Sequence, residues 1–236
     1  MKPRTALTGA LIAGALVVLP STAMGAVTRC TGTISNQSTG SIEVPSGAGC
    51  VLVGDQVNGS VKIDAGAALS LGTESGSTGN TVVGSINGTG IQSFDSYLPG
   101  STVTGSLALT GVTGVPDTGP LAAFGGTFLT DSANFLDALR VNGPTSITKG
   151  SGAAQWTDDN PDSFGGAFTY TNNGGFLQLE AGDTINGAMS LHGNTGGGEL
   201  EDLTVNGSLL CGNSPLFTVL GGLSVTGHNA AAGGTC

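Results

Sequence analysis

Apolar and polar residues alternate along short segments that recur through most of the chain. One copy places apolar residues at Val57, Val61 and Ile63, and a later copy repeats the pattern at Val205 and Leu209. An apolar period of two predicts β-strands that bury one face and expose the other. A second apolar cluster lies between successive copies, so each repeating unit contains two or three short strands.

A short motif marks each copy: Asn or Thr, then Gly, then a small residue, then an aliphatic one, as in the segment 58–61 (NGSV). Ten glycines mark the copies, about 21 residues apart on average: Gly40, Gly59, Gly84, Gly105, Gly126, Gly143, Gly166, Gly187, Gly207 and Gly227. The marker glycine lies in phase with the inward residues, where a missing side chain lets neighbouring chain segments approach closely.

A unit of this length, poor in helix formers, cannot close a core alone, whereas stacked units pair each strand with the coils above and below. The sequence therefore predicts an all-β fold, a single parallel β-solenoid of about ten coils with roughly 20 residues per coil. Ten coils correspond to a rod of about 45 to 50 Å. The preference for right-handed crossovers favours a right-handed β-helix. A sandwich or barrel built from hairpins is the alternative.

The four cysteines lie as one close pair at each end: Cys30 with Cys50, and Cys211 with Cys236. The first pair is separated by one period, so stacking places the two residues about 5 Å apart, within the range for a disulfide. The second pair would join the tail to the last coil. We therefore predict two disulfides, which is typical of an exported protein.

Three segments depart from the repeat. Residues 72–80 and 112–120 are rich in Gly, Ser, Thr and Pro, which predicts loops. In residues 129–140, Asp131 could cap a helix with Phe135 and Leu139 at helical spacing, which predicts a short helix. Residues 110–180 as a whole match the repeat least well and are expected to form irregular coils.

The first 26 residues resemble a signal peptide, with Lys2 and Arg4 before a short apolar run and small residues at 23–26. We expect cleavage after Gly25 or Ala26, leaving residues 27–236 as one β-solenoid domain. The apolar run is too short for a comfortable membrane span. We therefore expect the mature protein to be secreted or to lie in the cell envelope, without a membrane span.

Charge narrows the set of partners. Without Lys2 and Arg4 the chain has four basic residues against 16 acidic ones, a formal charge of −12. Nucleic acids and anionic membranes require clustered Lys and Arg, so neither is expected as a partner. Only 9% of residues are charged, far below the average of about 25%. Surface polarity must come from Ser, Thr and Asn, which suits self-association or binding to cell-surface carbohydrate.

The densest acidic cluster is Asp158, Asp159 and Asp162, close to the single tryptophan, Trp156. Several β-helical enzymes cut polysaccharides with carboxylates on one face and aromatic rings that stack on sugars. The same acids also fit a solvated loop, or oxygen ligands for Ca²⁺.

Other polar residues indicate chemistry only weakly. A polar strand face or corner explains the acidic residues Glu199, Glu201 and Asp202. The two histidines, His192 and His228, lie nearly two periods apart and lack metal-ligand spacing. The Gly-rich segments are not followed by helices, and no serine lies in a nucleophile elbow. The sequence therefore predicts no metal site and no cofactor.

The segments 30–34 (CTGTI), 44–50 (VPSGAGC) and 205–211 (VNGSLLC), with a terminal Cys236, resemble exported bacterial β-helical repeat proteins of uncharacterised function. The resemblance implies a β-helix with a cysteine pair at each cap and carries no catalytic residues. A weaker likeness in repeat style links the chain to polymer-forming solenoids of the bactofilin type.

These features favour a non-enzymatic structural or adhesive rod, secreted or in the cell envelope. A polysaccharide-active β-helical enzyme using the carboxylates at 158–162 is the alternative. Ice or mineral binding by a flat Thr-rich face is a third hypothesis, although the sequence lacks a regular Thr-x-Thr array.

Overall fold

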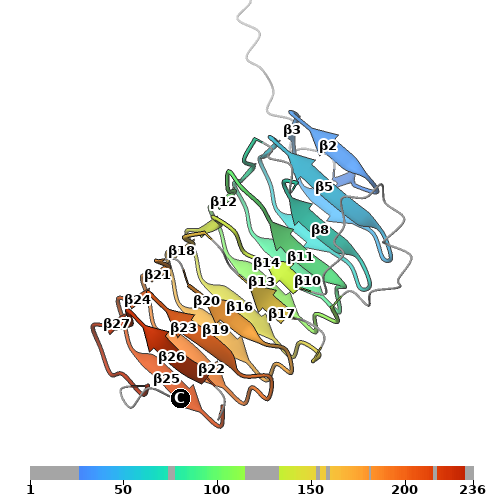
Figure 1. Ribbon diagram of the computed structural model, residues 1–236. Helices are drawn as coiled ribbons and strands as arrows, with labels where there is room; N and C mark the ends of the chain where they lie inside the picture. The colour runs from blue at the N-terminus through green and yellow to red at the C-terminus, as the bar shows by residue number, and fades with distance from the viewer. Residues whose placement is uncertain are drawn as a thin grey trace, which may run out of the picture.

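The computed structural model describes residues 27–73, 78–114, 133–152, 155–157, 160–180, 182–214 and 217–231. The described chain is all-β and winds as a parallel solenoid with three strands in each complete coil (Figure 1). The predicted fold class is confirmed. The strands assemble into three faces, and every strand pairing between coils is parallel. The right-handed winding stays a prediction.

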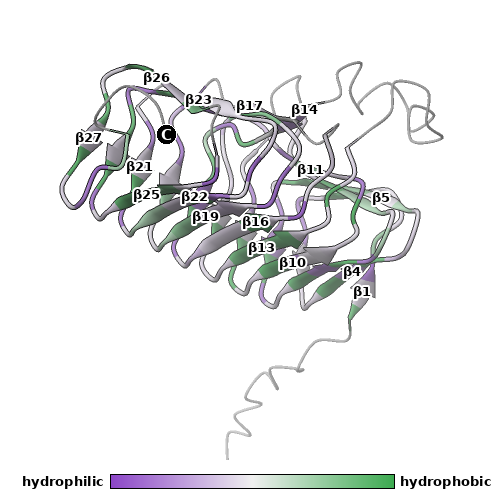
Figure 2. Ribbon diagram, turned by 90° about the horizontal axis from the view of Figure 1, so that it is seen from below, coloured by the Kyte–Doolittle hydropathy of each residue, from purple (hydrophilic) through white to green (hydrophobic). Residues whose placement is uncertain are grey.

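Sheet A contains nine strands and runs the length of the stack, as Figure 2 shows along its lower edge. Its strands, in order, are β1 (Thr28–Arg29), β4 (Ile42–Val44), β7 (Val61–Ile63), β10 (Ile86–Thr89), β13 (Leu107–Thr110), β16 (Thr145–Thr148), β19 (Phe168–Thr171), β22 (Met189–His192) and β25 (Leu209–Gly212).

Sheet C, also of nine strands, forms the second continuous face from two-residue strands. These are β3 (Ser38–Thr39), β6 (Gln56–Val57), β9 (Thr81–Val82), β12 (Thr102–Val103), β15 (Arg140–Val141), β18 (Ser163–Phe164), β21 (Thr184–Ile185), β24 (Thr204–Val205) and β27 (Ser224–Val225).

The third face is divided into two sheets. Sheet B contains β2 (Thr33–Ser35), β5 (Gly49–Val53), β8 (Ala68–Leu71) and β11 (Ser93–Ser96). Sheet D contains β14 (Ala133–Phe135), β17 (Gln155–Thr157), β20 (Leu177–Leu179), β23 (Gly198–Glu201) and β26 (Phe217–Gly221). Between the two sheets the described residues pair through an isolated bridge from Ser96 to Leu136, and the Phe94 N–H also donates to Asn134 Oδ1 over 3.0 Å.

The stack has about eight turns, not the ten predicted. Most strands of sheet A pair with the strand one repeat further along the chain, but Leu107 pairs directly with Thr145, almost two repeats later. The marker glycines show the same jump, because the Gly143 N–H donates to the Gly105 carbonyl over 2.9 Å. The stack therefore steps directly from Gly105 to Gly143, and the coil predicted around Gly126 lies outside the described ranges. Eight turns correspond to a rod of about 40 Å.

Eight of the nine remaining marker glycines, all except Gly40, form a column at the corner between sheets C and A, and Ser41 occupies this position in the first coil. A Cβ atom on Gly187 would lie 2.7 Å from both Gly166 C and Ala167 N, and one on Gly143 would lie 2.7 Å from Gly105 O. The prediction of close approach is confirmed at these positions, where the glycine lies against the backbone of the preceding coil. A larger residue would force the coils apart at this corner.

The helix predicted over residues 129–140 is wrong for its described part. Residues 133–135 form β14, which pairs in parallel with β17, and Arg140 begins β15. Leu136 and Leu139 are fully buried in the core. The spacing of these apolar residues fits a strand followed by a turn and a corner as well as it fits a helix. Pairing with the following coil selects the strand. The predicted loops at 72–80 and 112–120 lie partly outside the described residues.

One hydrophobic core fills the solenoid along its length. Aliphatic residues such as Val61 and Leu69 fill the first coils, and large aromatic residues such as Trp156 and Tyr170 fill the later ones. The core is closed at the first coils by the predicted disulfide between Cys30 and Cys50, whose Cα atoms are 5.5 Å apart.

The second cysteine pair is only partly described. Cys211 is disulfide-bonded, but Cys236 lies outside the described residues, so the Cys211–Cys236 pairing stays a prediction. No helix in the described ranges is long and apolar enough to cross a membrane.

Candidate functional site

Asp162, the described member of the predicted acidic cluster, is an interior residue, only 2% exposed. Its Oδ1 accepts a hydrogen bond from the Leu139 N–H over 2.6 Å, and its own N–H donates to Asp183 Oδ1 over 2.7 Å. Asp158 and Asp159 lie outside the described residues. Trp156 is fully buried, so its ring cannot stack on a sugar.

Asp162 and Asp183 belong to a repeated corner position, the residue immediately before each strand of sheet C. Asp55, Asn80 and Ser101 occupy the same position in earlier coils and are equally buried. Asn80 Oδ1 accepts the Asp55 N–H over 2.9 Å, and Ser101 Oγ accepts the Asn80 N–H over 3.2 Å. Each side chain thus binds the backbone of the preceding coil, which makes this column a structural ladder.

A second buried ladder follows sheet A in the later coils. Asn173 Oδ1 accepts the Gly150 N–H, Asn194 Oδ1 accepts the Asn173 N–H, and Ser214 Oγ accepts the Asn194 N–H, over 2.7 to 3.1 Å. The Asn194 amide also donates to the Tyr170 carbonyl over 2.7 Å. These groups satisfy backbone atoms at a corner where no strand pairing is available.

Tyr170 lies beside this second ladder. Its hydroxyl donates to the Gly175 carbonyl over 2.9 Å. Burial raises the pKa of the Tyr170 phenol above its ordinary value of about 10, because the low-polarity core disfavours the phenolate. The side chain therefore contributes to packing and does not serve as an acid or base near neutral pH.

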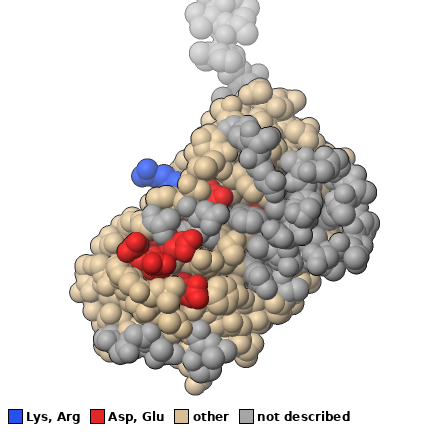
Figure 3. Space-filling view, in the orientation of Figure 1, with Lys and Arg blue, Asp and Glu red and all other residues tan. Residues whose placement is uncertain are grey.

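Sheet D brings acidic side chains from neighbouring coils together on its outer face. Gln178 pairs in register with Glu199, and the Gln178 amide donates to Glu180 Oε2 over 2.8 Å. Glu199 and Glu201 both point outward from β23 and are half-buried. Figure 3 shows acidic side chains gathered on the face toward the viewer. Asp202, at an exposed corner with a φ of 48°, continues the acidic surface.

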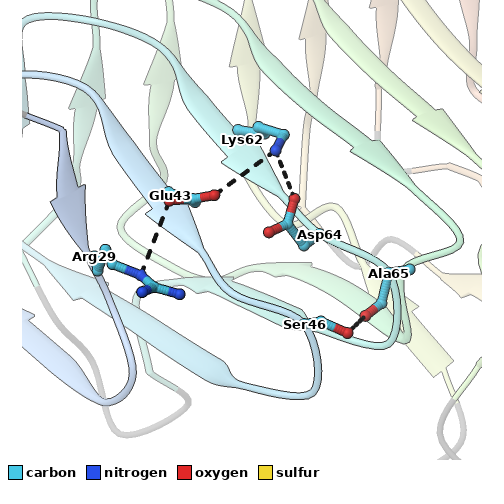
Figure 4. Close-up of polar contacts among 6 residues, drawn as sticks. All are labelled: Arg29, Glu43, Ser46, Lys62, Asp64 and Ala65. Carbon is cyan, nitrogen blue, oxygen red and sulfur yellow. Dashed lines mark hydrogen bonds and ion pairs between the residues drawn. The ribbon is translucent and has the colours of Figure 1, made fainter.

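The first rungs of sheet A carry a charged network on their outer side (Figure 4). Arg29 lies 3.9 Å from Glu43, and Lys62 contacts Glu43 at 3.7 Å and Asp64 at 2.8 Å. The hydrogen bond to Asp64 raises the pKa of the Lys62 ammonium. The open hollow beside Lys62 and Asp64 also borders Asn87. Exposed ion pairs of this kind contribute little to stability.

Beyond this network the outer face of sheet A becomes uncharged. Thr89, Thr110, Thr148 and Thr171 stack in register on four successive strands, and His192 follows them on β22. The Thr110 and Thr148 hydroxyl oxygens are 3.2 Å apart. We call these four residues the threonine column of sheet A.

The outer side of sheet C carries two parallel columns, which we call the sheet C face. The first column is Ser38, Gln56, Thr81, Thr102, Arg140, Ser163, Thr184, Thr204 and Ser224. The second column, two residues later in each coil, is Gly40, Asn58, Val83, Thr104, Asn142, Gly165, Asn186, Asn206 and Thr226.

Hydrogen bonds order this face from coil to coil. The Asn206 amide donates to Asn186 Oδ1 over 2.9 Å, and the Asn58 amide donates to Ser38 Oγ over 2.9 Å. Backbone pairing also continues through the second column, as in the bond from the Asn186 N–H to Phe164 O over 2.8 Å. None of the 18 positions, all within the described ranges, is acidic, and Arg140 is the one cation among them.

The two histidines do not come together. His192 is exposed at the end of β22, and His228 is exposed after β27. The described part of the chain holds no group of three or more His, Cys, Asp or Glu residues arranged to bind a metal ion.

Comparison with known proteins adds no relative: no family model, curated protein or solved structure matches the chain. The resemblance to exported bacterial β-helical proteins is thus supported in its fold alone.

Sequence reasoning missed the two ladders and the two-column face, although the first ladder had a signal. A polar residue precedes the pairs Gln56-Val57, Thr81-Val82 and Thr184-Ile185. An Asp or Asn recurring directly before an outward–inward pair indicates a corner residue that satisfies backbone groups.

Proposed function

We propose that the mature chain is a non-enzymatic, exported rod that holds a structural or adhesive position in the cell envelope or outside the cell. The observation that carries this proposal is the sheet C face, where at least one hydroxyl or amide side chain recurs in each of nine consecutive coils and Arg140 is the one charged residue. Such a face offers many equivalent weak contacts along one line. It suits attachment to an extended surface better than capture of a small molecule, which uses concave sites.

Two further features support export. Residues 1–26 have the composition of a signal peptide. The Cys30–Cys50 disulfide is consistent with an oxidising compartment. The proposal includes a mature N-terminus at Ala26 or Val27, which N-terminal sequencing of the exported chain would identify.

The alternative, a polysaccharide-cleaving enzyme, loses support at its described residue. The Asp162 carboxylate accepts a backbone hydrogen bond inside the solenoid and does not face solvent. A general acid or base must reach the glycosidic oxygen or the attacking water.

The test uses purified residues 27–236 carrying a fluorescent label. We expect the protein to remain on washed cells or matrix of the source organism after repeated rinsing, and to release no reducing sugar from a panel of polysaccharides. Turnover of any polysaccharide, or complete removal by the first rinse, would overturn the proposal. Unlabelled protein competing for the same sites serves as the control for nonspecific adhesion.

A further inference from the structure

We propose that the sheet C face binds ice. This inference rests on the proposed function, because it names the extended surface that one face of the rod would attach to.

Adjacent strands of sheet C lie about 4.8 Å apart, and residues two apart along a strand lie about 6.8 Å apart. Thr184 and Asn186 lie beside Thr204 and Asn206 of the next coil, so hydroxyl and amide groups occupy the corners of this grid. Both lengths are of the size at which oxygen atoms repeat across the faces of an ice crystal. The side chains can therefore hold water molecules at positions that continue the lattice.

The chemistry of the face fits ordered water. Threonine places a methyl group beside its hydroxyl, and apolar groups restrict the orientations of first-shell water. Thr81, Thr102, Thr184 and Thr204 all lie in the first column and are half-exposed. Acidic groups would bind water in a geometry of their own, and this face has none although the chain carries 16 acidic residues. A face whose one charged residue is Arg140, on an acidic protein, suits an uncharged partner.

The area of the sheet C face is too small for a stable interface with a second copy of the chain. Eight steps of about 4.8 Å and a width of about 10 Å give roughly 400 Å². Stable protein interfaces bury about 800 Å² on each partner and concentrate aromatic anchors at the centre. The 18 outward positions, all described, contain no aromatic residue. Crystalline polysaccharide, which aromatic platforms would bind, fits less well for the same reason.

The face is also preorganised. Its side chains stand on a hydrogen-bonded solenoid, and amide bonds such as that from Asn206 to Asn186 hold the second column in place. Little side-chain entropy is then lost on binding.

The test compares residues 27–236 with two double variants. Thr184→Lys with Thr204→Lys places charge and bulk on adjacent strands of the sheet C face. Thr148→Lys with Thr171→Lys makes the same change on adjacent strands of the threonine column of sheet A and serves as the matched control. Circular dichroism melting verifies that all three proteins fold. Each labelled protein is then frozen slowly with stirring, and its concentration is measured in the ice and in the liquid.

We expect the wild type and the sheet A variant to enter the ice at least tenfold above a non-binding control protein, and the sheet C variant to fall to that control. Wild-type protein that stays in the liquid, or equal loss in both double variants, would overturn the inference. Retention on microcrystalline chitin or cellulose without ice adsorption would also overturn it. Retention on cells without ice adsorption refutes ice binding alone and leaves the proposed function standing.

Discussion

The glycine column predicts a sharp difference between two Gly→Ala substitutions. In Gly187→Ala the new methyl group would lie 2.7 Å from backbone atoms of Gly166 and Ala167, whereas ordinary contacts begin at 3.4 Å. Because backbone atoms cannot turn aside as a flexible side chain can, the two coils must separate by about 0.7 Å at this corner. The matched substitution Gly221→Ala meets no atom within 4 Å.

The separation would weaken hydrogen bonds on both sides of the corner. The Asn186 N–H to Phe164 O distance is 2.8 Å and the Phe168 N–H to Ala188 O distance is 2.9 Å. A shift of about 0.7 Å stretches these distances to about 3.5 and about 3.6 Å, at or beyond the limit of a hydrogen bond. We expect Gly187→Ala to lower the free energy of unfolding by about 1 to 3 kcal/mol, the usual cost of overpacking.

Urea unfolding measures this effect, because Trp156 is the single tryptophan and is buried in the core. We expect Gly187→Ala to shift the midpoint to lower urea at an unchanged slope. Gly221→Ala should leave the midpoint unchanged or raise it slightly, since alanine reduces the entropy of the unfolded chain. If Gly187→Ala unfolds at the wild-type midpoint, the close contact between coils is refuted.

Three further predictions concern the interior. Asn194→Ala leaves the buried Asn173 N–H and Tyr170 carbonyl without their partner. It should lower the free energy of unfolding in urea by about 2 to 5 kcal/mol. The control Asn186→Ala, on the surface, should lower it by under about 1 kcal/mol, and equal losses of free energy in the two variants would refute the ladder. Folding raises the pKa of Tyr170, so the stability that its neutral phenol contributes is fully present below pH 10 and is lost as the pH rises above 10. Tyr170→Phe should therefore reduce the alkaline fall in the urea midpoint, and an identical fall in both proteins would contradict the assignment. Cys50→Ser removes the Cys30–Cys50 disulfide and should lower the free energy of unfolding by about 3 kcal/mol. The melting temperature should fall, and a reducing agent should not lower it further by breaking this bond. A melting temperature equal to that of the oxidised wild type would rule out a stabilising role.

Part of the candidate site was predictable because each side chain's direction depends on its own strand. The alternation at Thr204, Val205 and Asn206 predicts one inward residue between two outward ones, and the structure confirms it. The Cys30–Cys50 pairing was predictable for a similar reason, since a spacing of one period places both residues on adjacent coils.

The number of coils was not predictable in the same way. Gly126 fits the spacing of the marker glycines, yet Gly105 pairs with Gly143. The local sequence pattern identifies a residue that is suited to a corner. Which corners stack on one another is decided by the free energy of strand pairing summed over the three faces. Asp162 shows the same limit: in the sequence it belongs to an acidic run, whereas stacking places its carboxylate against the Leu139 N–H.

By itself, the sequence determined that the chain is all-β, that it repeats a unit of fairly constant length, and which residues of each unit face the core. Only the tertiary structure decided which units are neighbours, and therefore that the hydroxyl and amide groups of nine strands form the continuous sheet C face. The physical reason is that strand pleating is local, whereas the register between coils depends on connections of unequal length. The connection that carries the chain from Leu107 to its partner Thr145 is about twice as long as the one from Ile42 to Val61.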